Sequence, residues 1–304
     1  MTDAAPLPTF LVIGAQKSAT RWLKANLSEH PDVYVVADEI SYFDSPHRVR
    51  EDGPAWYREQ FAGCTGQPVV GEGTPGYMIW HRRPADVAER VEQLVPDVRL
   101  VALVRNPVDR AVSAFVHHQR RGRIDRGADL VELVRRAAPD LADGRHPPER
   151  CVYGWGGPQT LVTGGWYGAS LAPFVERFGA RLQVVVHDDL VADPGLVYRA
   201  VLEHLGADPD FVPTDLPAQR FSTSAGRRRG RASGPPPLSL DQRCELYELF
   251  RHDVAELERL TGRDFGMWDP AGGPEPRHDR SPDPGGRLGV EGRPDAGQAP
   301  PGGA

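Results

Sequence analysis

The sequence predicts an α/β fold with a central parallel β-sheet and helices on both of its faces. Apolar runs such as FLVIG, VRLVALV and RLQVVV alternate along the chain with segments that have helical periodicity. Strands that are apolar along their whole length are typical of parallel sheets that helices bury on both sides. With 304 residues, the chain is long enough to bury a full core of this kind.

The first half of the chain alternates between strands and helices. The pattern predicts strands at 10–14, 68–73 and 97–105, and helices at about 19–30, 83–95 and 107–121. Prolines mark the helix ends, because Pro31 follows the first helix while Pro84 and Pro107 open the other two. This order gives a strand, a loop and a helix three times in succession.

The second half continues the alternation. The pattern predicts helices near 129–137 and 159–178, a buried strand in RLQVVVHDDL (181–190), and a long last helix at 238–262. Polar residues gather where the apolar runs end, in GAQKSAT, GEGTPGY, RNPVDR and HDDL. Because open α/β sheets bind ligands at the carboxyl ends of their strands, we expect the functional residues in these four stretches.

We expect one domain over residues 9–269, preceded by an N-terminal arm (1–8). In the tail, 270–304, roughly half of the residues are Gly or Pro and large apolar side chains are almost absent, so burial cannot offset the entropy of ordering it. The sequence therefore predicts a disordered tail.

Composition limits the partners and the setting. The formal net charge of −6 argues against nucleic acid as a partner. The three cysteines are widely spaced, which indicates a reducing compartment and no zinc site. We find no leader pattern and no apolar run long enough for an integral membrane segment, so we expect a soluble, cytoplasmic protein. The oligomeric state is not readable from these features.

The loop GAQKSAT points to an anion. A strand that runs through a short loop into a helix directs backbone N–H groups at one spot, where phosphate binds well. Lys17 and Lys24 are the only lysines among 36 basic residues, so a lysine kept at position 17 is informative. The loop departs from GxxxxGK[ST], because it has one glycine and the lysine comes three residues after it.

A second anion site is expected after the strand that ends at Arg105. Pro107 starts the next helix and Ser113 lies about two turns into it, so N–H groups, a hydroxyl and a guanidinium can converge there. Two separate anion sites indicate a nucleotide with two phosphate groups. The alternative interpretation pairs Arg105 with Asp109 and leaves Ser113 as an ordinary helix residue.

The segments GAQKSATRW, VRNPVDRAVSAF and GRRRGRAS occur in the order found in sulfotransferases that use 3′-phosphoadenylyl sulfate (PAPS). From about Thr9 to Trp268 the chain resembles that family, and most of all the heparan sulfate O-sulfotransferase branch and its bacterial relatives. The resemblance implies a P-loop-like sulfotransferase fold, PAPS as co-substrate and no metal. It also implies a nucleotide site made of Lys17, Ser18, Ala19, Thr20 and Arg21 at the 5′-phosphosulfate, Arg105 and Ser113 at the 3′-phosphate, and Arg229, Gly230 and Arg231 as a closing turn.

The resemblance also implies an acceptor side. Glu39, in DEISYFDS, matches the general base that removes the proton of an acceptor hydroxyl, and Lys17 matches the lysine that assists catalysis. Candidate acceptor contacts are Glu72 and Tyr77 in GEGTPGY, and Trp166 and Tyr167 in GGWYGAS. The structural alternatives are a solvated turn for Glu39, a loop cap for Glu72 and core packing for Trp166 and Tyr167. Many members of the heparan branch carry a lysine where this chain has Gly73, which departs from a glycosaminoglycan-type acceptor site.

The function expected from these features is transfer of a sulfuryl group from PAPS to a hydroxyl of a small-molecule, glycolipid or carbohydrate acceptor, with an amine acceptor left open. The arginine-rich, alanine-rich composition suggests a bacterial source, and therefore secondary metabolites among the acceptors. Two rival functions stay open: a P-loop-type nucleotide kinase or NTPase, and a non-catalytic anion- or glycan-binding protein on the same scaffold.

Overall fold

The computed structural model describes residues 5–79, 83–142, 158–214, 216 and 237–272. A five-stranded sheet with the order β2-β3-β1-β4-β5 forms its centre, and every neighbouring pair of strands is parallel. The strands are β1 (Phe10–Gly14), β2 (Val33–Val35), β3 (Val69–Gly73), β4 (Arg99–Val104) and β5 (Leu182–Val186). The predicted parallel α/β fold is confirmed.

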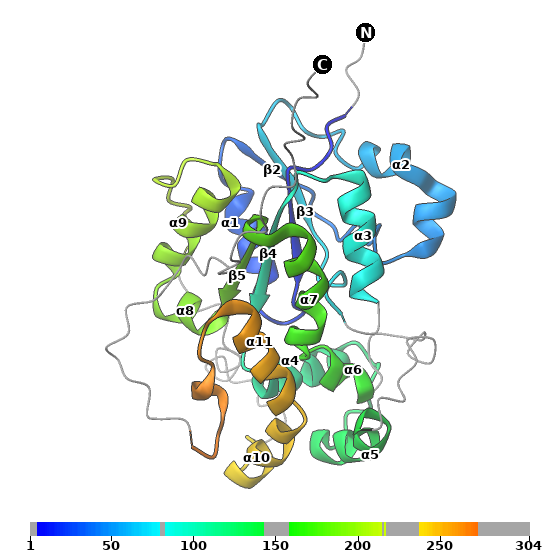
Figure 1. The fold of residues 1–304 in the computed structure, drawn as a ribbon, viewed down its shortest axis with the longest axis vertical. Helices are drawn as coiled ribbons and strands as arrows, with labels where there is room; N and C mark the ends of the chain where they lie inside the picture. The colour runs from blue at the N-terminus through cyan, green and yellow to red at the C-terminus, as the bar shows by residue number, and fades with distance from the viewer. Residues whose placement is uncertain (1–4, 80–82, 143–157, 215, 217–236, 273–304) are drawn as a thin grey trace, which may run out of the picture.

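Eleven α-helices lie in the described part of the chain (Figure 1). They are α1 (Thr20–Leu27), α2 (Gly53–Glu59), α3 (Pro84–Leu94), α4 (Pro107–Arg120), α5 (Leu130–Ala142), α6 (Pro158–Thr163), α7 (Tyr167–Phe178), α8 (His187–Ala192), α9 (Pro194–Leu205), α10 (Leu240–Glu248) and α11 (Arg251–Thr261). Within this part, none of the helices combines the length and the apolar character that a membrane span requires.

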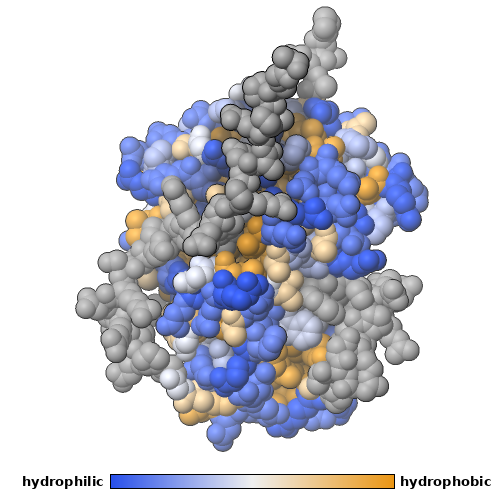
Figure 2. Space-filling model, in the orientation of Figure 1, coloured by the Kyte–Doolittle hydropathy of each residue, from blue (hydrophilic) through white to orange (hydrophobic). Residues whose placement is uncertain are grey.

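Alternation along the strands divides the core into two layers. In β1, Leu11 and Ile13 pack into the larger cluster with residues of α3, α4 and α7, while Phe10 and Val12 pack into the smaller cluster with α1 and α9. Figure 1 shows α1 and α9 on one side of the sheet and α3 and α7 on the other. Successive side chains of a strand point to opposite faces, so each apolar strand supplies both layers. On the face shown in Figure 2, the described surface is mostly hydrophilic.

Two helices expected to be continuous are broken. The segment 159–178 divides into α6 and α7 at Gly164 and Gly165, where the buried Arg110 packs so closely that a Cβ at Gly164 would lie 2.7 Å from its Nη1 atom. The segment 238–262 divides into α10 and α11 next to Leu249, whose carbonyl oxygen accepts a hydrogen bond from the indole of Trp166 at 3.1 Å. In both places the break in the helical pattern lies beside a contact with a distant part of the chain.

Three sequence expectations fall wholly or partly on residues outside the described part. The tail is described only to Gly272, and the N-terminal arm only from Ala5. The proposed closing turn, Arg229–Gly230–Arg231, also lies outside the described residues.

The topology places a crevice at the centre of the sheet. From β1 the chain passes outward to β2 and β3, and α3 then carries it across β1 to β4. The strand order therefore reverses between β1 and β4, which is where open α/β sheets hold their ligands. The loops after β1, β3 and β4 meet there.

Candidate active site

The loop between β1 and α1 has a backbone that few residue types adopt. Lys17 and Ala19 have positive φ angles of 74° and 77°, in the left-handed region where side chains other than glycine are strained. Ala19 is the N-cap of α1 and supplies no side-chain hydrogen bond. The first N–H groups of α1 are therefore not taken by a capping side chain of Ala19, which suits an anion at this helix end.

Cations crowd around this loop. Burial lowers the pKa of Lys17, and the neighbouring Arg21 and Arg105 lower it further because like charges disfavour its charged form. The Arg105 guanidinium donates from Nη1 to the carbonyl oxygen of Lys17 at 3.3 Å, which ties the end of β4 to the loop after β1. An anion bound here would relieve the repulsion among these three side chains.

The start of α4 differs from the expectation in one respect. The side chain of Asn106 caps this helix and accepts from the N–H groups of Val108 at 3.0 Å and Asp109 at 3.2 Å. The expectation that N–H groups at this helix start bind the second phosphate is therefore corrected, since Asn106 already binds two of them. Arg105 and Ser113 remain as the side chains available to an anion at this position.

The alternative partner for Arg105 is not the one observed. Asp109 forms its ion pair with Arg243 instead, at 2.9 Å. Ser113 is buried, with 8% of its surface exposed, and it lines the same cavity as Arg105. The pair predicted for the 3′-phosphate therefore lies together in the structure.

Two cavities adjoin at this end of the sheet. The inner cavity, of about 390 Å³, is lined by Gln16, Lys17, Ala19, Thr20, Arg21, Trp22, Ala25, Asn26, Glu29, Glu39, Pro75, Arg105, Ser113, His117 and His187. The outer cavity, of about 740 Å³, is lined by Gln16, Thr20, Arg21, Lys24, Ala25, Ser28, Val35, Val36, Ala37, Asp38, Glu39, Gly73, Pro75, His117, Arg121 and Arg123. Both volumes lie in the range of about 300–1,000 Å³ that is typical of ligand sites.

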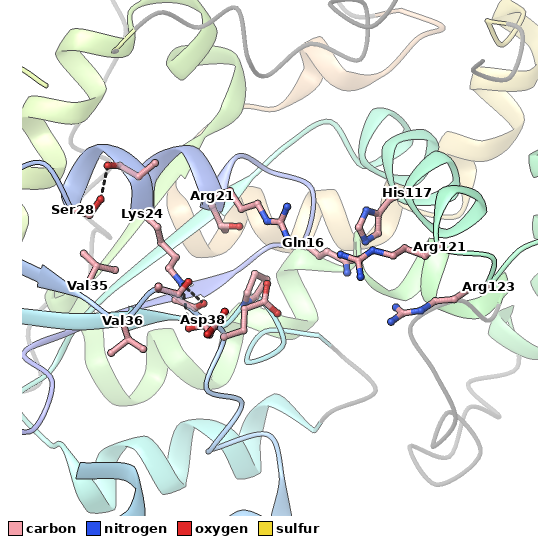
Figure 3. Close-up of a pocket in the computed structure, with 16 residues that line it drawn as sticks. Gln16, Arg21, Lys24, Ser28, Val35, Val36, Asp38, His117, Arg121 and Arg123 are labelled. Atoms are coloured by element: carbon pink, nitrogen blue, oxygen red, sulfur yellow. Dashed lines mark hydrogen bonds between the residues drawn. The ribbon is translucent and has the colours of Figure 1, made fainter. Parts of the chain in front are cut away.

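Glu39 borders both cavities. It is exposed, and it lies in the segment that joins β2 to the helical turn before α2. Figure 3 shows the outer cavity with Lys24 and Asp38 at one end and His117, Arg121 and Arg123 at the other, with Arg21 and Gln16 between them. A carboxylate at this junction can accept a proton from a group in the outer cavity while that group faces the inner cavity.

Glu72 has a different environment from Glu39. It is fully buried at the end of β3, and burial raises its pKa to about 7. Its Oε1 atom accepts from the hydroxyl of Tyr77 at 2.5 Å and from that of Tyr57 at 3.4 Å, and its Oε2 atom accepts from Thr74 at 2.7 Å. These bonds, and the nearby Lys24, favour the ionised form and oppose the effect of burial.

The hydroxyls bound to Glu72 also hold the segment that carries Glu39. The N–H group of Ser41 donates to Thr74 Oγ1 at 3.1 Å, and the N–H group of Tyr42 donates to the Tyr77 hydroxyl at 3.3 Å. The hydroxyls of Thr74 and Tyr77 thus each donate a hydrogen bond to Glu72 and accept one from a backbone N–H group of the segment that carries Glu39. We call Glu72, Thr74, Tyr77 and Tyr57 the buried hub.

The four predicted acceptor contacts lie away from the two cavities. Glu72 and Tyr77 are buried and line neither cavity, so they support the site from beneath it. Tyr167 is 1% exposed and Trp166 packs against the core, and neither lines either of these two cavities. Of the four candidate acceptor contacts, none reaches either cavity, because each is used in packing or in hydrogen bonds of the interior.

One predicted nucleotide residue also turns inward. Ser18 is fully buried and lines neither cavity, whereas Lys17, Ala19, Thr20 and Arg21 all line the inner one. Its side chain lies toward Tyr167. Burial raises the pKa of Tyr167, and the neighbouring Arg110 and Ser18 offset only part of that rise. Only the backbone of Ser18 remains to contribute to the anion site.

Sequence reasoning missed several cavity residues. Lys24, Arg121 and Arg123 line the outer cavity, and His187 lines the inner one. The rarity of lysine was a usable signal for Lys24, since both lysines of the chain lie in this site. The two arginines follow α4 in a basic run, HHQRRGR, that gave no indication of which side chains turn toward the cavity.

Comparison with known proteins gives a consistent result. Residues 7–136 match the sulfotransferase domain family, and this range contains Lys17, Glu39, Glu72, Arg105 and Ser113. Mouse heparan sulfate glucosamine 3-O-sulfotransferase 3B1 is 28% identical over 279 residues, which cover 86% of this chain and 65% of the relative. The corresponding mouse 3-O-sulfotransferase 6 is 28% identical over 280 residues, covering 86% of this chain and 74% of the relative.

A solved structure agrees with these sequence relatives. The crystal structure of a sulfotransferase from Alicyclobacillus acidocaldarius superposes with a TM-score of 0.66 and 27% sequence identity, over 87% of this chain and 99% of that one. The chain thus spans about two thirds of the length of the first mouse relative and nearly the full length of the bacterial structure. The domain match over residues 7–136, the sequence relatives and the shared fold all point to a sulfotransferase.

Proposed function

We propose that this chain transfers a sulfuryl group from PAPS to a hydroxyl group of an acceptor and releases adenosine 3′,5′-bisphosphate. The observation that carries this proposal is the position of Glu39, which borders an inner cavity rich in anion-binding groups and an outer cavity open to an acceptor. A base at that junction is what transfer between two bound molecules requires.

The inner cavity fits the donor by the chemistry of its lining. Lys17 and the uncapped start of α1 lie at one side, where they suit a phosphosulfate, and Arg105 with Ser113 suits the 3′-phosphate. Lys17, Arg21 and Arg105 repel one another, and this repulsion also favours a multiply charged anion in the inner cavity. When bound, PAPS supplies an activated sulfuryl group.

Each residue has a defined part in the transfer. Glu39 accepts the proton of the acceptor hydroxyl while the acceptor oxygen forms its new bond to sulfur. Lys17 and the N–H groups of the loop stabilise the negative charge that develops on the phosphate oxygen as its bond to sulfur breaks. Sulfuryl transfer resembles phosphoryl transfer in depending chiefly on positioning and charge neutralisation.

The outer cavity supports a polar acceptor that carries negative charge. Arg21, Arg121 and Arg123 line it and are exposed, so they suit carboxylate or sulfate groups. The named acceptor of the mouse relatives is a glucosamine of heparan sulfate, and we include carbohydrates, glycolipids and small secondary metabolites in the proposed range.

We also propose a bacterial, cytoplasmic setting for this reaction. The widely spaced cysteines support a reducing compartment, and Cys64 and Cys244, the two in the described part, are free thiols. The arginine-rich composition supports the bacterial source.

A transfer assay with labelled PAPS and a panel of acceptors tests the proposal. The panel would contain anionic oligosaccharides, neutral glycolipids, phenols and amines, each incubated with wild-type protein and with Glu39→Gln. We expect product with at least one hydroxyl acceptor, and a rate about 10²–10⁴-fold lower for the variant, which loses a general base. Equal rates for the two proteins would reject Glu39 as the base, and wild-type protein that transfers label to no acceptor would reject the proposed reaction.

A further inference from the structure

Lys24 is the second lysine of the chain, and the mechanism above does not use it. The two lysines line different cavities: Lys17 lies in the inner one and Lys24 in the outer one. Lys24 belongs to α1, and Figure 3 shows its side chain reaching down from that helix toward the backbone beside Asp38.

The ammonium of Lys24 joins two segments that are far apart in sequence. Its Nζ atom donates to the carbonyl oxygens of Ala37 at 3.1 Å, Asp38 at 3.4 Å and Gly73 at 3.4 Å. Ala37 and Asp38 immediately precede Glu39, and Gly73 ends β3. The same ammonium therefore connects the backbone that carries the proposed base to the carboxyl end of β3.

Gly73 makes room for this arrangement. A Cβ atom at position 73 would lie 2.7 Å from Cδ of Lys24 and 3.2 Å from its Cγ, both closer than ordinary carbon contacts. The methylene groups of Lys24 thus occupy the volume that a side chain at position 73 would enter. An amino group can reach this spot along either of two routes, from α1 through position 24 or from β3 through position 73.

Carboxylates surround the ammonium. Glu72, Glu39 and Asp38 favour its charged form, while Arg21 acts against it and burial lowers the pKa of Lys24 overall. Glu72 is fully buried, whereas Asp38 and Glu39 are exposed. The positive charge therefore lies between the buried hub and the cavity surface.

The segment from Val36 to Ser41, which carries Glu39, is held at both ends. The N–H group of Val36 donates to the carbonyl oxygen of Gly71 at 2.9 Å, and the N–H group of Ser41 donates to Thr74. Between these two bonds the carbonyl groups of residues 37 and 38 are bound by Lys24. Displacing a reacting group by about 1 Å is enough to cost about 10²-fold in rate, so this fastening matters for a base.

We propose that Lys24 is a positioning residue of the sulfuryl-transfer site, one that fastens the backbone in front of Glu39 to β3 by an ammonium group inserted over Gly73. This inference rests on the proposed function, because it gives Glu39 its reacting position. Activity therefore depends on where the ammonium lies, and not on which element carries it.

The test is an exchange of the lysine between the two positions. We would compare wild-type protein, Lys24→Ala, and the double variant Lys24→Ala/Gly73→Lys, in which the alanine frees the volume that the new side chain needs. We expect kcat of the single variant to fall by about 10²-fold, as for a misplaced base. The double variant is expected to regain most of that loss.

A second readout separates positioning from simple destabilisation. Because Lys24 does not line the inner cavity, we expect calorimetry to give the same Kd for adenosine 3′,5′-bisphosphate in all three proteins. The matched variant Gly73→Ala keeps the lysine but places a Cβ against its Cδ, and we expect it to lower kcat without changing that Kd.

Each outcome decides the inference. A Lys24→Ala protein with wild-type kcat would overturn it, and so would a double variant that melts at the wild-type temperature yet recovers no activity. These results differ from failure of the proposed function, in which wild-type protein itself would bind no adenosine 3′,5′-bisphosphate and transfer no label.

Discussion

The inner and outer cavities are built in different ways, although they meet at Glu39. The inner cavity is rich in cations and is lined mainly by the loop after β1, by α1, and by Arg105 with residues of α4. The outer cavity rests on the buried hub, in which Glu72 binds hydroxyls that in turn hold the segment above them. Charge and local geometry therefore define the proposed donor side, whereas a buried hydrogen-bond network defines the side of the proposed base.

On the donor side, a large effect is expected from removing charge in the inner cavity. Lys17→Ala should lower the transfer rate by about 10²–10³-fold, the cost of losing one preorganised donor at a developing charge. Single-turnover measurements with saturating donor would show the loss in the chemical step. A wild-type rate for this variant would remove the distinction between the two cavities, because the cation would then have no special role on the donor side.

Beneath the outer cavity, the buried hub should make the stability of the folded protein depend on pH. The folded-state pKa of Glu72 is raised from 4.5 to about 7, so the folded protein binds more protons than the unfolded chain between these values. Stability therefore falls as pH rises from about 4.5 to 7, and the contribution of this one group reaches about 3 kcal/mol.

Glu72→Gln isolates that contribution. Asp253, with its pKa raised to about 6 by burial, acts in the same direction, whereas His117, His118 and His187, with pKa values lowered to about 4, act in the opposite one. The difference in unfolding free energy between wild type and variant cancels these groups. Chemical denaturation at pH 5, 6, 7 and 8 should show this difference shrinking toward neutral pH, and a constant difference would contradict a Glu72 pKa near 7.

A smaller change within the hub tests its link to the base. Tyr77→Phe leaves Glu72 without one donor and the Tyr42 N–H group without its acceptor, which should cost about 1–3 kcal/mol of stability. We expect kcat to fall while binding of adenosine 3′,5′-bisphosphate is unchanged. Thr74→Val is the matched variant, because it removes the parallel connection from Ser41 to Glu72.

The smallest effect is expected at the rim of the outer cavity. Arg121 is exposed, and an exposed ion pair contributes about 0.2–1 kcal/mol, so Arg121→Ala should raise KM for an anionic acceptor by up to about fivefold. KM for PAPS should not change, since Arg121 does not line the inner cavity. The acceptor effect should also weaken as salt is added. An unchanged acceptor KM would argue for a neutral acceptor.

The same difference explains how much could be predicted from the sequence. Lys17, Ala19, Thr20 and Arg21 follow β1 directly, and Arg105 follows β4, so the pattern of strand, loop and helix was enough to place them at one cavity. The parallel sheet followed from the apolar runs for the same local reason.

The remaining features depend on contacts between distant segments. Nothing local to Glu72 shows that Tyr57 and Tyr77 enclose it, or that Ser41 and Tyr42 rest on the same network. The inward turn of Ser18 and the core positions of Trp166 and Tyr167 are likewise results of packing. The apparent loss of a charge at Gly73 also has a structural answer, because Lys24 fills that space from another element.

Calorimetry with adenosine 3′,5′-bisphosphate, applied to wild type, Glu39→Gln and Lys17→Ala, tests most directly that the inner cavity holds the donor through Lys17 and that Glu39 is not needed to bind it. The account predicts binding of similar affinity to wild type and Glu39→Gln, and much weaker binding to Lys17→Ala. No binding to folded wild-type protein, or equal binding to all three, would contradict it.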